Sequence, residues 1–182
     1  MKIKVHPFTP ERRNDFYAVH SNAHDCGWCN CVAWWTPGWN GWAERSAADN
    51  RALREKLLEQ NQYDGYLLYV DDAPAGWCQV GPRDRLTKLA AAHDLLPDPA
   101  AWAVSCVLIV PAQRGHGLAH VLLAGVIDDL RRRGVQRLEA FPRRGDNLPA
   151  EDVWTGPERL FLALGFLPER VGERRTVMAL RL

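Results

Sequence analysis

What the sequence lacks narrows the class of protein first. No run of apolar residues approaches the roughly 18 that suggest a membrane-spanning helix, and no apolar core follows the short basic start. The formal net charge is only +1, so no global field would recruit nucleic acid or an acidic membrane surface. We therefore expect a soluble, cytoplasmic protein without nucleic-acid or membrane partners.

Cysteine is too sparse for a disulfide scaffold, and lysine is rare. The five cysteines are an odd number in a chain of 182 residues, which favours reduced thiols over a disulfide framework. With 47% hydrophobic residues the chain can bury one sizeable core, and its length predicts a single domain over residues 1–182. Four lysines stand against nineteen arginines, a bias typical of a GC-rich bacterial genome. The oligomeric state stays open, with a homodimer as one option.

One stretch, from Val107 to Arg133, organises what is present. The apolar run from Trp102 to Val110 predicts a buried central strand that ends at Pro111. After a turn that contains Gly115 and Gly117, apolar residues return at helical spacing. The first N–H groups of a helix have no intrahelical partners and lie at the positive end of its dipole. This junction is therefore a candidate phosphate site.

The turn resembles a known motif. Arg114-Gly115-His116-Gly117-Leu118-Ala119 fits the Arg/Gln-x-x-Gly-x-Gly/Ala pattern of the GNAT family of acyl-CoA-dependent N-acetyltransferases, and it lies where that family has it. A second likeness is the predicted helix from Gly156 that closes with Gly165-Phe166. The dinucleotide pattern Gly-x-Gly-x-x-Gly is not met, because no third glycine follows, so a nicotinamide enzyme fits less well.

The resemblance implies a fold, a cofactor and a cofactor site. The fold would be α/β, a single domain with a GNAT-type mixed central β-sheet flanked by helices on both faces. The cofactor would be acetyl-CoA, and the helix that contains Phe161 would lie against its thiol end. The resemblance also implies two sets of main-chain contacts: with the pyrophosphate at Arg114, Gly115, His116, Gly117, Leu118 and Ala119, and with the pantetheine arm at Val107, Leu108, Ile109 and Val110.

The catalytic residues of the resembled family are only partly present. Many relatives have a glutamate on the central strand as general base, but this strand has no carboxylate, so the candidates become Glu139 on the next strand and Asp152 in the following loop. A salt bridge is the alternative role for Glu139. Relatives commonly have a tyrosine as general acid where this chain has Phe161, and often an asparagine where it has Trp154. The oxyanion would bind a backbone N–H near Val107 or Leu108.

Residues 21–43 form a segment rich in cysteine and tryptophan that we expect to wall the acceptor side. Five of the eight tryptophans lie in it, together with three cysteines. A lid over the core is the alternative, and zinc is a weaker one, because Cys26-x-x-Cys29 has no second ligand pair at the usual distance. No metal is therefore predicted. The expected acceptor-binding residues are Trp28, Cys29, Trp34, Trp35 and, for a negative group on the acceptor, Arg83.

The rest of the chain predicts scaffold. Ser46 is expected to cap a helix up to Gln60 whose charged residues, Arg54 among them, face water. The remaining predicted elements are a first strand before Pro7, helices at 9–20 and 84–96, a hairpin of 65–70 with 75–80, and strands at 137–141, 167–171 and 176–181.

The function that these features favour is transfer of an acetyl group from acetyl-CoA to a primary amine. The acceptor would be a small molecule or a peptide, and the amine would attack directly in a ternary complex. The alternative is a non-catalytic acyl-CoA-binding or metal-binding module that acts as a sensor.

Overall fold

One mixed sheet runs through the protein. The computed structural model describes residues 1–145, 148–149 and 152–182, without the side chains of residues 24–26. The sheet has seven strands in the order β1-β2-β3-β4-β5-β7-β6; β4 and β5 run parallel, and the other neighbouring pairs run antiparallel. The strands are β1 (Ile3–Pro7), β2 (Gly65–Val70), β3 (Ala73–Pro82), β4 (Ala101–Ile109), β5 (Arg137–Ala140), β6 (Leu167–Val171) and β7 (Thr176–Arg181).

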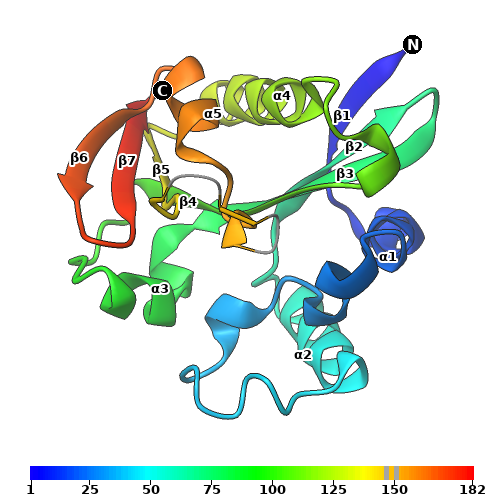
Figure 1. Cartoon of the computed structure of the whole chain (residues 1–182), viewed down its shortest axis with the longest axis horizontal. Coiled ribbons are helices and arrows are strands. Elements are labelled where there is room, and N and C mark those ends of the chain that lie inside the picture. The colour runs from blue at the N-terminus through cyan, green and yellow to red at the C-terminus, as the bar shows by residue number, and fades with distance from the viewer. Residues whose placement is uncertain (146–147, 150–151) are drawn as a thin grey trace.

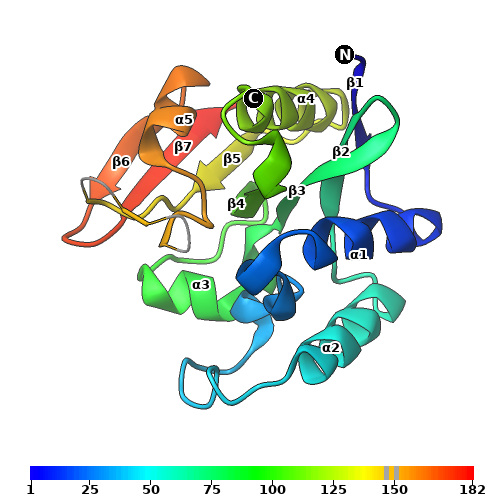
Figure 2. The same cartoon turned by 45° about the vertical axis from the view of Figure 1, so that its right-hand side comes forward.

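Helices cover both faces of the sheet, which confirms the predicted fold class. Figures 1 and 2 show α4 (Leu118–Arg132) and α5 (Glu158–Ala163) on one face, with α1 (Arg13–Ser21), α2 (Ala47–Glu59) and α3 (Thr87–Ala92) on the other. In the described part of the chain, five short 3-10 helices connect these elements: η1 (Pro10–Arg12), η2 (His24–Cys29), η3 (Ala33–Trp35), η4 (Arg83–Arg85) and η5 (Pro111–Gln113). Within the described ranges, no helix has both the length and the apolar character needed to cross a bilayer.

The core follows the sequence pattern of the central elements. Every residue of β2 is buried, and Trp77 of β3 is fully buried at the centre. On α4 the buried side chains are Leu118, Leu122, Leu123, Val126, Ile127 and Leu130, which recur at helical spacing and face the sheet.

Two predicted helices are shorter than expected. The first begins as the turn η1 after Thr9, and α1 follows only from Arg13. The segment 84–96 forms η4 and the six-residue α3, and Leu86 between them has φ −98° and ψ 65°, outside the helical region. The cap at Ser46 is confirmed, because its side chain accepts from the Asp49 N–H while the Asp49 carboxylate accepts from the Ser46 N–H.

The prediction that Arg54 faces water is wrong. Its side chain is fully buried, and its guanidinium carbon lies 4.0 Å from the ring centre of Phe16 and 4.9 Å from that of Phe8. Its Nη1 donates to the hydroxyl of Tyr17 and to the carboxylate of Glu55. Arg54 therefore joins α2 to α1 through the ring of Phe16 and the hydroxyl of Tyr17, whereas its ion pair with Glu55 lies within α2.

Candidate active site

The site begins where β4 and β5 separate. The two strands pair from Ala101 with Arg137 to Val104 with Ala140, and β4 then continues without β5 to Ile109. The pairing of β4 with β3 shifts by one residue at this point, which leaves Ser105 unpaired in a β-bulge. Beyond the bulge, the edge of β4 that faced β5 is open to other partners.

The backbone groups on that edge follow from strand alternation. Val110 donates its N–H to Ala75, so Leu108, two residues earlier, also faces β3. Val107 and Ile109 face the opposite edge, where the Val107 N–H donates to the carbonyl of Trp154 at 2.8 Å. Of the two amides expected to hold an oxyanion, Leu108 is thus directed into the sheet, and Val107 has a partner from the 152–157 loop.

The predicted phosphate turn forms the next part of the site. Gly115 and Gly117 have φ values of 81° and 73°, in the left-handed region that favours glycine, and α4 begins directly after them. Arg114 donates through Nε to the carbonyl of Ile109 at 2.9 Å, which ties the turn to the end of β4. Because α4 has fifteen residues, its first N–H groups present a full helix dipole to this turn.

A single cavity of about 670 Å³ joins the turn to the cysteine- and tryptophan-rich segment. Its walls come from β4, the start of α4, the 153–159 segment, the β6–β7 hairpin and residues 20–42. The lining residues are His20, Trp28, Cys29, Cys31, Ala33, Trp34, Trp39, Trp42, Ser105, Cys106, Val107, Leu108, Ile109, Arg114, Ala119, Val153, Trp154, Pro157, Arg159 and Arg175.

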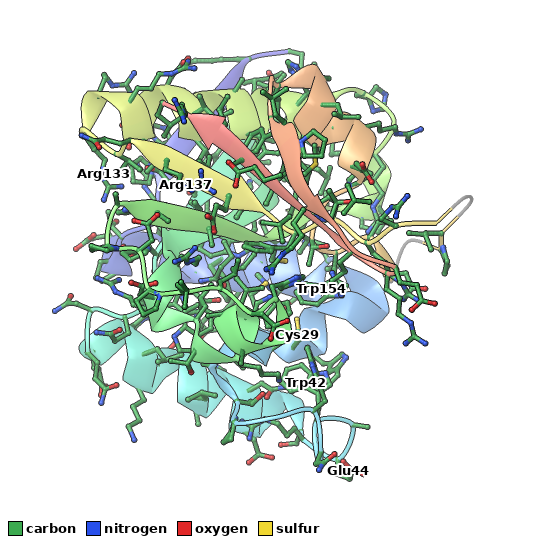
Figure 3. All side chains as sticks on the ribbon, turned by 90° about the vertical axis from the view of Figure 1, so that its left-hand side faces the viewer. Cys29, Trp42, Glu44, Arg133, Arg137 and Trp154 are labelled. Carbon is green, nitrogen blue, oxygen red and sulfur yellow. The ribbon has the colours of Figure 1, made fainter. Side chains whose placement is uncertain are left out.

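Five tryptophans form one continuous wall of this cavity, which we call the tryptophan wall. Trp28 contacts Trp42 with ring centres 5.0 Å apart, and Trp42 contacts Trp39 at 6.2 Å. The ring centre of Trp34 lies 5.4 Å from that of Trp39 and 5.6 Å from that of Trp154, so Trp34 connects the two. Figure 3 shows Trp154, Cys29 and Trp42 on the same side of the molecule, from loops far apart in sequence.

Lys88 of α3 contacts the tryptophan wall at Trp39 and at the backbone of residues 33–38. Its ammonium nitrogen lies 3.5 Å from the ring centre of Trp39 and donates to the carbonyls of Ala33 and Gly38 and to the hydroxyl of Thr36. Burial lowers the pKa of Lys88 to about 8. The three bonds fix residues 33–38 on α3, so the wall is held in place before any ligand binds.

Sulfur atoms line the cavity beside the tryptophan wall. Cys31 Sγ lies 3.3 Å from Cys106 Sγ on β4 and 3.3 Å from Nε2 of His20. The hydrogen bond to Cys106 and burial raise the pKa of Cys31, whereas burial lowers the pKa of His20 to about 4. The Cys31 thiol and the His20 imidazole are therefore neutral near pH 7. Among the described residues, no three His, Cys, Asp or Glu side chains are arranged to hold a metal ion.

Glu139 does not lie at the cavity, which corrects its predicted role as general base. Its side chain is 1% exposed, and Arg83 donates to both of its carboxylate oxygens at 3.1 Å while Arg137 donates at 2.8 Å. Figure 3 places Arg137 well apart from Cys29 and Trp154. Both oxygens of this carboxylate are therefore occupied by guanidinium groups outside the cavity lining. The same ion pair corrects the prediction that Arg83 binds a negative group on the acceptor, because Arg83 is bonded to Glu139 and does not line the cavity.

The other predicted site residues divide between the cavity and the core. Val107, Leu108, Ile109, Arg114, Ala119, Trp28, Cys29 and Trp34 line the cavity, whereas His116 is exposed outside it. Trp35 is partly buried against Tyr63 and does not line the cavity. Phe161 is fully buried against Phe166 and is a core residue. Asp152 immediately precedes the lining residue Val153, and its carboxylate forms an ion pair with Arg143.

Sequence reasoning missed several lining residues. The sequence around His20 and Cys31 has no periodic pattern that places them, and the apolar run of the central strand does not show that Cys106 faces a thiol from another segment. Arg175 had no signal at all, because it lies between two predicted strands. It donates to the carbonyl of Phe141 and to the hydroxyl of Thr155, and no carboxylate of the described residues lies within ion-pair distance of it.

Comparisons with known proteins agree with this architecture. The model of the Acetyltransferase (GNAT) family matches residues 28–156, whereas no curated protein matches by sequence. An acetyltransferase from Thermus thermophilus superposes with a TM-score of 0.60 at 17% identity, covering 100% of this chain and 98% of that chain. The ribosomal-protein-S18-alanine N-acetyltransferase from Escherichia coli gives 0.57 at 18% identity, covering 99% and 94%.

A third solved structure carries the cofactor. The PaiA N-acetyltransferase from Thermoplasma acidophilum, in complex with coenzyme A, superposes with a TM-score of 0.56 at 9% identity, covering 100% of both chains. At these identities the superpositions establish the fold, and the family match establishes the class. The chain belongs to the GNAT family of acyl-CoA-dependent N-acetyltransferases, whose acyl donor is acetyl-CoA.

Proposed function

We propose that this enzyme moves the acetyl group of acetyl-CoA to a primary amine of a small molecule or peptide, by direct attack in a ternary complex. One observation carries the proposal: a single cavity runs from the phosphate turn, along the open edge of β4, to the tryptophan wall. Donor and acceptor can therefore occupy adjoining parts of one space, which supplies the proximity that a direct attack requires.

The donor would be held by backbone groups and one arginine. The amides of residues 114–119 would bind the pyrophosphate, with Arg114 beside them, and the edge of β4 at 107–110 would pair with the pantetheine arm. The Val107 N–H can bind the thioester oxygen only after its hydrogen bond to the Trp154 carbonyl breaks. The N–H of Ile109 is directed to the same edge. The 152–157 loop would thus shift when the cofactor binds.

Proton transfer would depend on solvent. Of the described residues that line the cavity, none is Asp or Glu, so the amine would lose its proton to water. The thiol of CoA, with a pKa of about 8.5, can leave as the thiolate without a tyrosine. The rate should then rise with pH until the amine is neutral. Asp152, which pairs with Arg143, is the alternative general base, and Asp152→Asn distinguishes the two routes. Proton loss to water predicts turnover within about threefold of wild type, whereas a base at Asp152 predicts a much larger loss.

The donor site is tested by reversing one charge. We expect Arg114→Glu to weaken acetyl-CoA binding about 100-fold in calorimetry, because it replaces a cation beside the phosphates with an anion. Arg131→Glu at the far, exposed end of α4 is the matched control and should bind normally. Normal affinity in Arg114→Glu would refute this cofactor site.

The activity is tested by thiol release from acetyl-CoA with a broad panel of amines and short peptides. Amine-dependent release supports the transferase, and binding of acetyl-CoA without release from any amine would favour a sensor. A cytoplasmic location, a bacterial source and a homodimer remain predictions from composition and family.

A further inference from the structure

The charge of the cavity wall disfavours acceptor amines that carry several positive charges. The charged side chains among its described lining residues are Arg114, Arg159 and Arg175, and none is acidic. A polyamine or an aminoglycoside carries several positive charges and would need carboxylates here. An acceptor without an excess of positive charge fits this wall better.

Arg175 is the cation on the acceptor side. It comes from the β6–β7 hairpin, lies over the ring of Trp154 at 5.9 Å and lines the cavity. Burial lowers its pKa, yet its described partners are a carbonyl and a hydroxyl group and not a carboxylate. A partly buried guanidinium without a carboxylate partner is suited to bind an anion that arrives with a ligand.

The tryptophan wall supplies the second recognition element. Its five rings give a large apolar surface fixed in position by Lys88 and by the contacts among the rings themselves. Such a surface binds flat apolar or aromatic groups, since stacked and edge contacts add to the burial of area. The wall and Arg175 meet at Trp154, so a single small molecule can contact both.

We infer that the acceptor is an amine that also carries an aromatic body and a carboxylate, as an aromatic amino acid does. This inference rests on the proposed N-acetyltransferase activity and names its substrate class. The ring would lie on the tryptophan wall and the carboxylate on Arg175, which leaves the amine to face the thioester along β4.

The test compares three amines: tryptophan, tryptamine, which lacks only the carboxylate, and spermidine, which lacks both the ring and the carboxylate and carries several positive charges. We expect kcat/KM for tryptophan to exceed that for tryptamine about tenfold or more, because a charge-assisted hydrogen bond is lost, and spermidine to be the poorest. Preference for tryptamine or spermidine would overturn the inference while the activity stands. Release from no amine in the broad panel would overturn the activity and the inference together.

Two variants assign the recognition to residues. Arg175→Gln should lower kcat/KM for tryptophan about tenfold or more and leave tryptamine within about threefold, with acetyl-CoA affinity unchanged. A loss of acetyl-CoA affinity instead would place Arg175 at the donor and refute its role. Trp39 is 47% exposed, so Trp39→Ala should fold and lose activity with tryptophan, whereas Trp39→Phe should retain most of it. Trp35→Phe, outside the cavity lining, is the matched control.

A second inference rests on the separate contact between two thiols. Cys31 and Cys106 lie 75 residues apart in sequence, yet their sulfur atoms are 3.3 Å apart in the wall of the cavity. His20 donates through Nδ1 to the carbonyl of Phe16 at 2.9 Å, so its Nε2 presents a lone pair to Cys31. The geometry points to Cys31 and Cys106 as a pair that a peroxide converts to a reversible disulfide.

The chemistry balances with one peroxide. The Cys31 sulfur attacks a peroxide oxygen, so that an S–O bond forms and the O–O bond breaks. The thiol proton passes through Nε2 of His20 to the departing hydroxide, which leaves as water, so His20 ends the step neutral. The sulfur of Cys106 then attacks the Cys31 sulfur, so that the S–S bond forms and the S–O bond breaks. The departing hydroxide takes the Cys106 thiol proton and leaves as the second water. The sulfur atoms must approach by about 1.3 Å to reach the bond length, a shift that loop residues can absorb.

Peptide mapping after hydrogen peroxide treatment and alkylation tests this pair. We expect a cross-linked peptide containing Cys31 and Cys106 that dithiothreitol reverses, and its absence in Cys31→Ser and in Cys106→Ser. Cys78→Ser, a buried core thiol, should retain the cross-link. A cross-link of Cys29 with Cys31, or irreversible oxidation of Cys31 with Cys106 unmodified, would refute the inference.

Discussion

Glu139 is a carboxylate whose neighbours decide its role. It is 1% exposed and accepts hydrogen bonds from Arg83 and Arg137, so its removal would leave two guanidinium groups without their buried anion. Breaking a buried pair from one side costs about 3 kcal/mol or more. We therefore expect Glu139→Gln to lower the free energy of unfolding by about this amount, measured by urea denaturation, while the folded fraction keeps its turnover.

The exposed partner of the same network gives the control. Glu169 also pairs with Arg137, but its side chain is 48% exposed, so Glu169→Gln should cost less than about 1 kcal/mol. A stable Glu139→Gln variant that has lost turnover would restore Glu139 as a catalytic residue. The contrast shows why one residue's identity does not predict its role: the same side chain is a base or a structural anion according to what surrounds it.

The two ends of α4 share one backbone feature with different functions. Gly117 before the helix and Gly134 after it have φ values of 73° and 76°, and neither has an atom within 4 Å of an added Cβ. Alanine at either position should therefore cost about 1 kcal/mol of stability through backbone strain alone. We expect only Gly117→Ala to weaken acetyl-CoA binding, because only Gly117 shapes the phosphate turn. Calorimetry of both variants checks this, and equal affinities would contradict the assignment.

Elements fixed by local sequence were predictable, and those fixed by distant contacts were not. The strand, the glycine turn and α4 follow from apolar spacing and two glycines within one stretch of chain. The helix at Ser46 follows from a cap three residues from its partner. In contrast, η2 and η3 have no periodicity of their own, and η3 is held by hydrogen bonds from Trp34 to β4 and from Lys88 of α3 to Ala33.

At the scale of the whole molecule, the sequence predicted the fold and the position of the glycine turn before α4, but not which distant residues line the cavity beside the tryptophan wall. The donor side depends on a motif and on the order of the elements. The acceptor side depends on which distant segments meet: Cys31 with Cys106, Arg175 with Trp154, and Arg83 with Glu139. A single sequence contains no signal for such pairs, which is why it placed Arg83 at the site, whereas in the structure Arg83 pairs with Glu139 and Arg175 lines the cavity.

The stability of the whole protein should fall in mild acid because of His20. Burial lowers the pKa of His20 to about 4 in the folded state, against 6.5 in the unfolded chain. The unfolded state then binds a proton that the folded state does not, so the contribution of His20 to stability is complete above pH 6.5 and is lost as the pH falls toward 4. Between pH 7 and pH 5 the loss is about 2 kcal/mol. Urea denaturation at both values should show a decline that His20→Phe reduces by this amount. An equal decline in both proteins would mean that His20 is protonated in the folded state, because only an unprotonated buried imidazole couples folding to pH in this range.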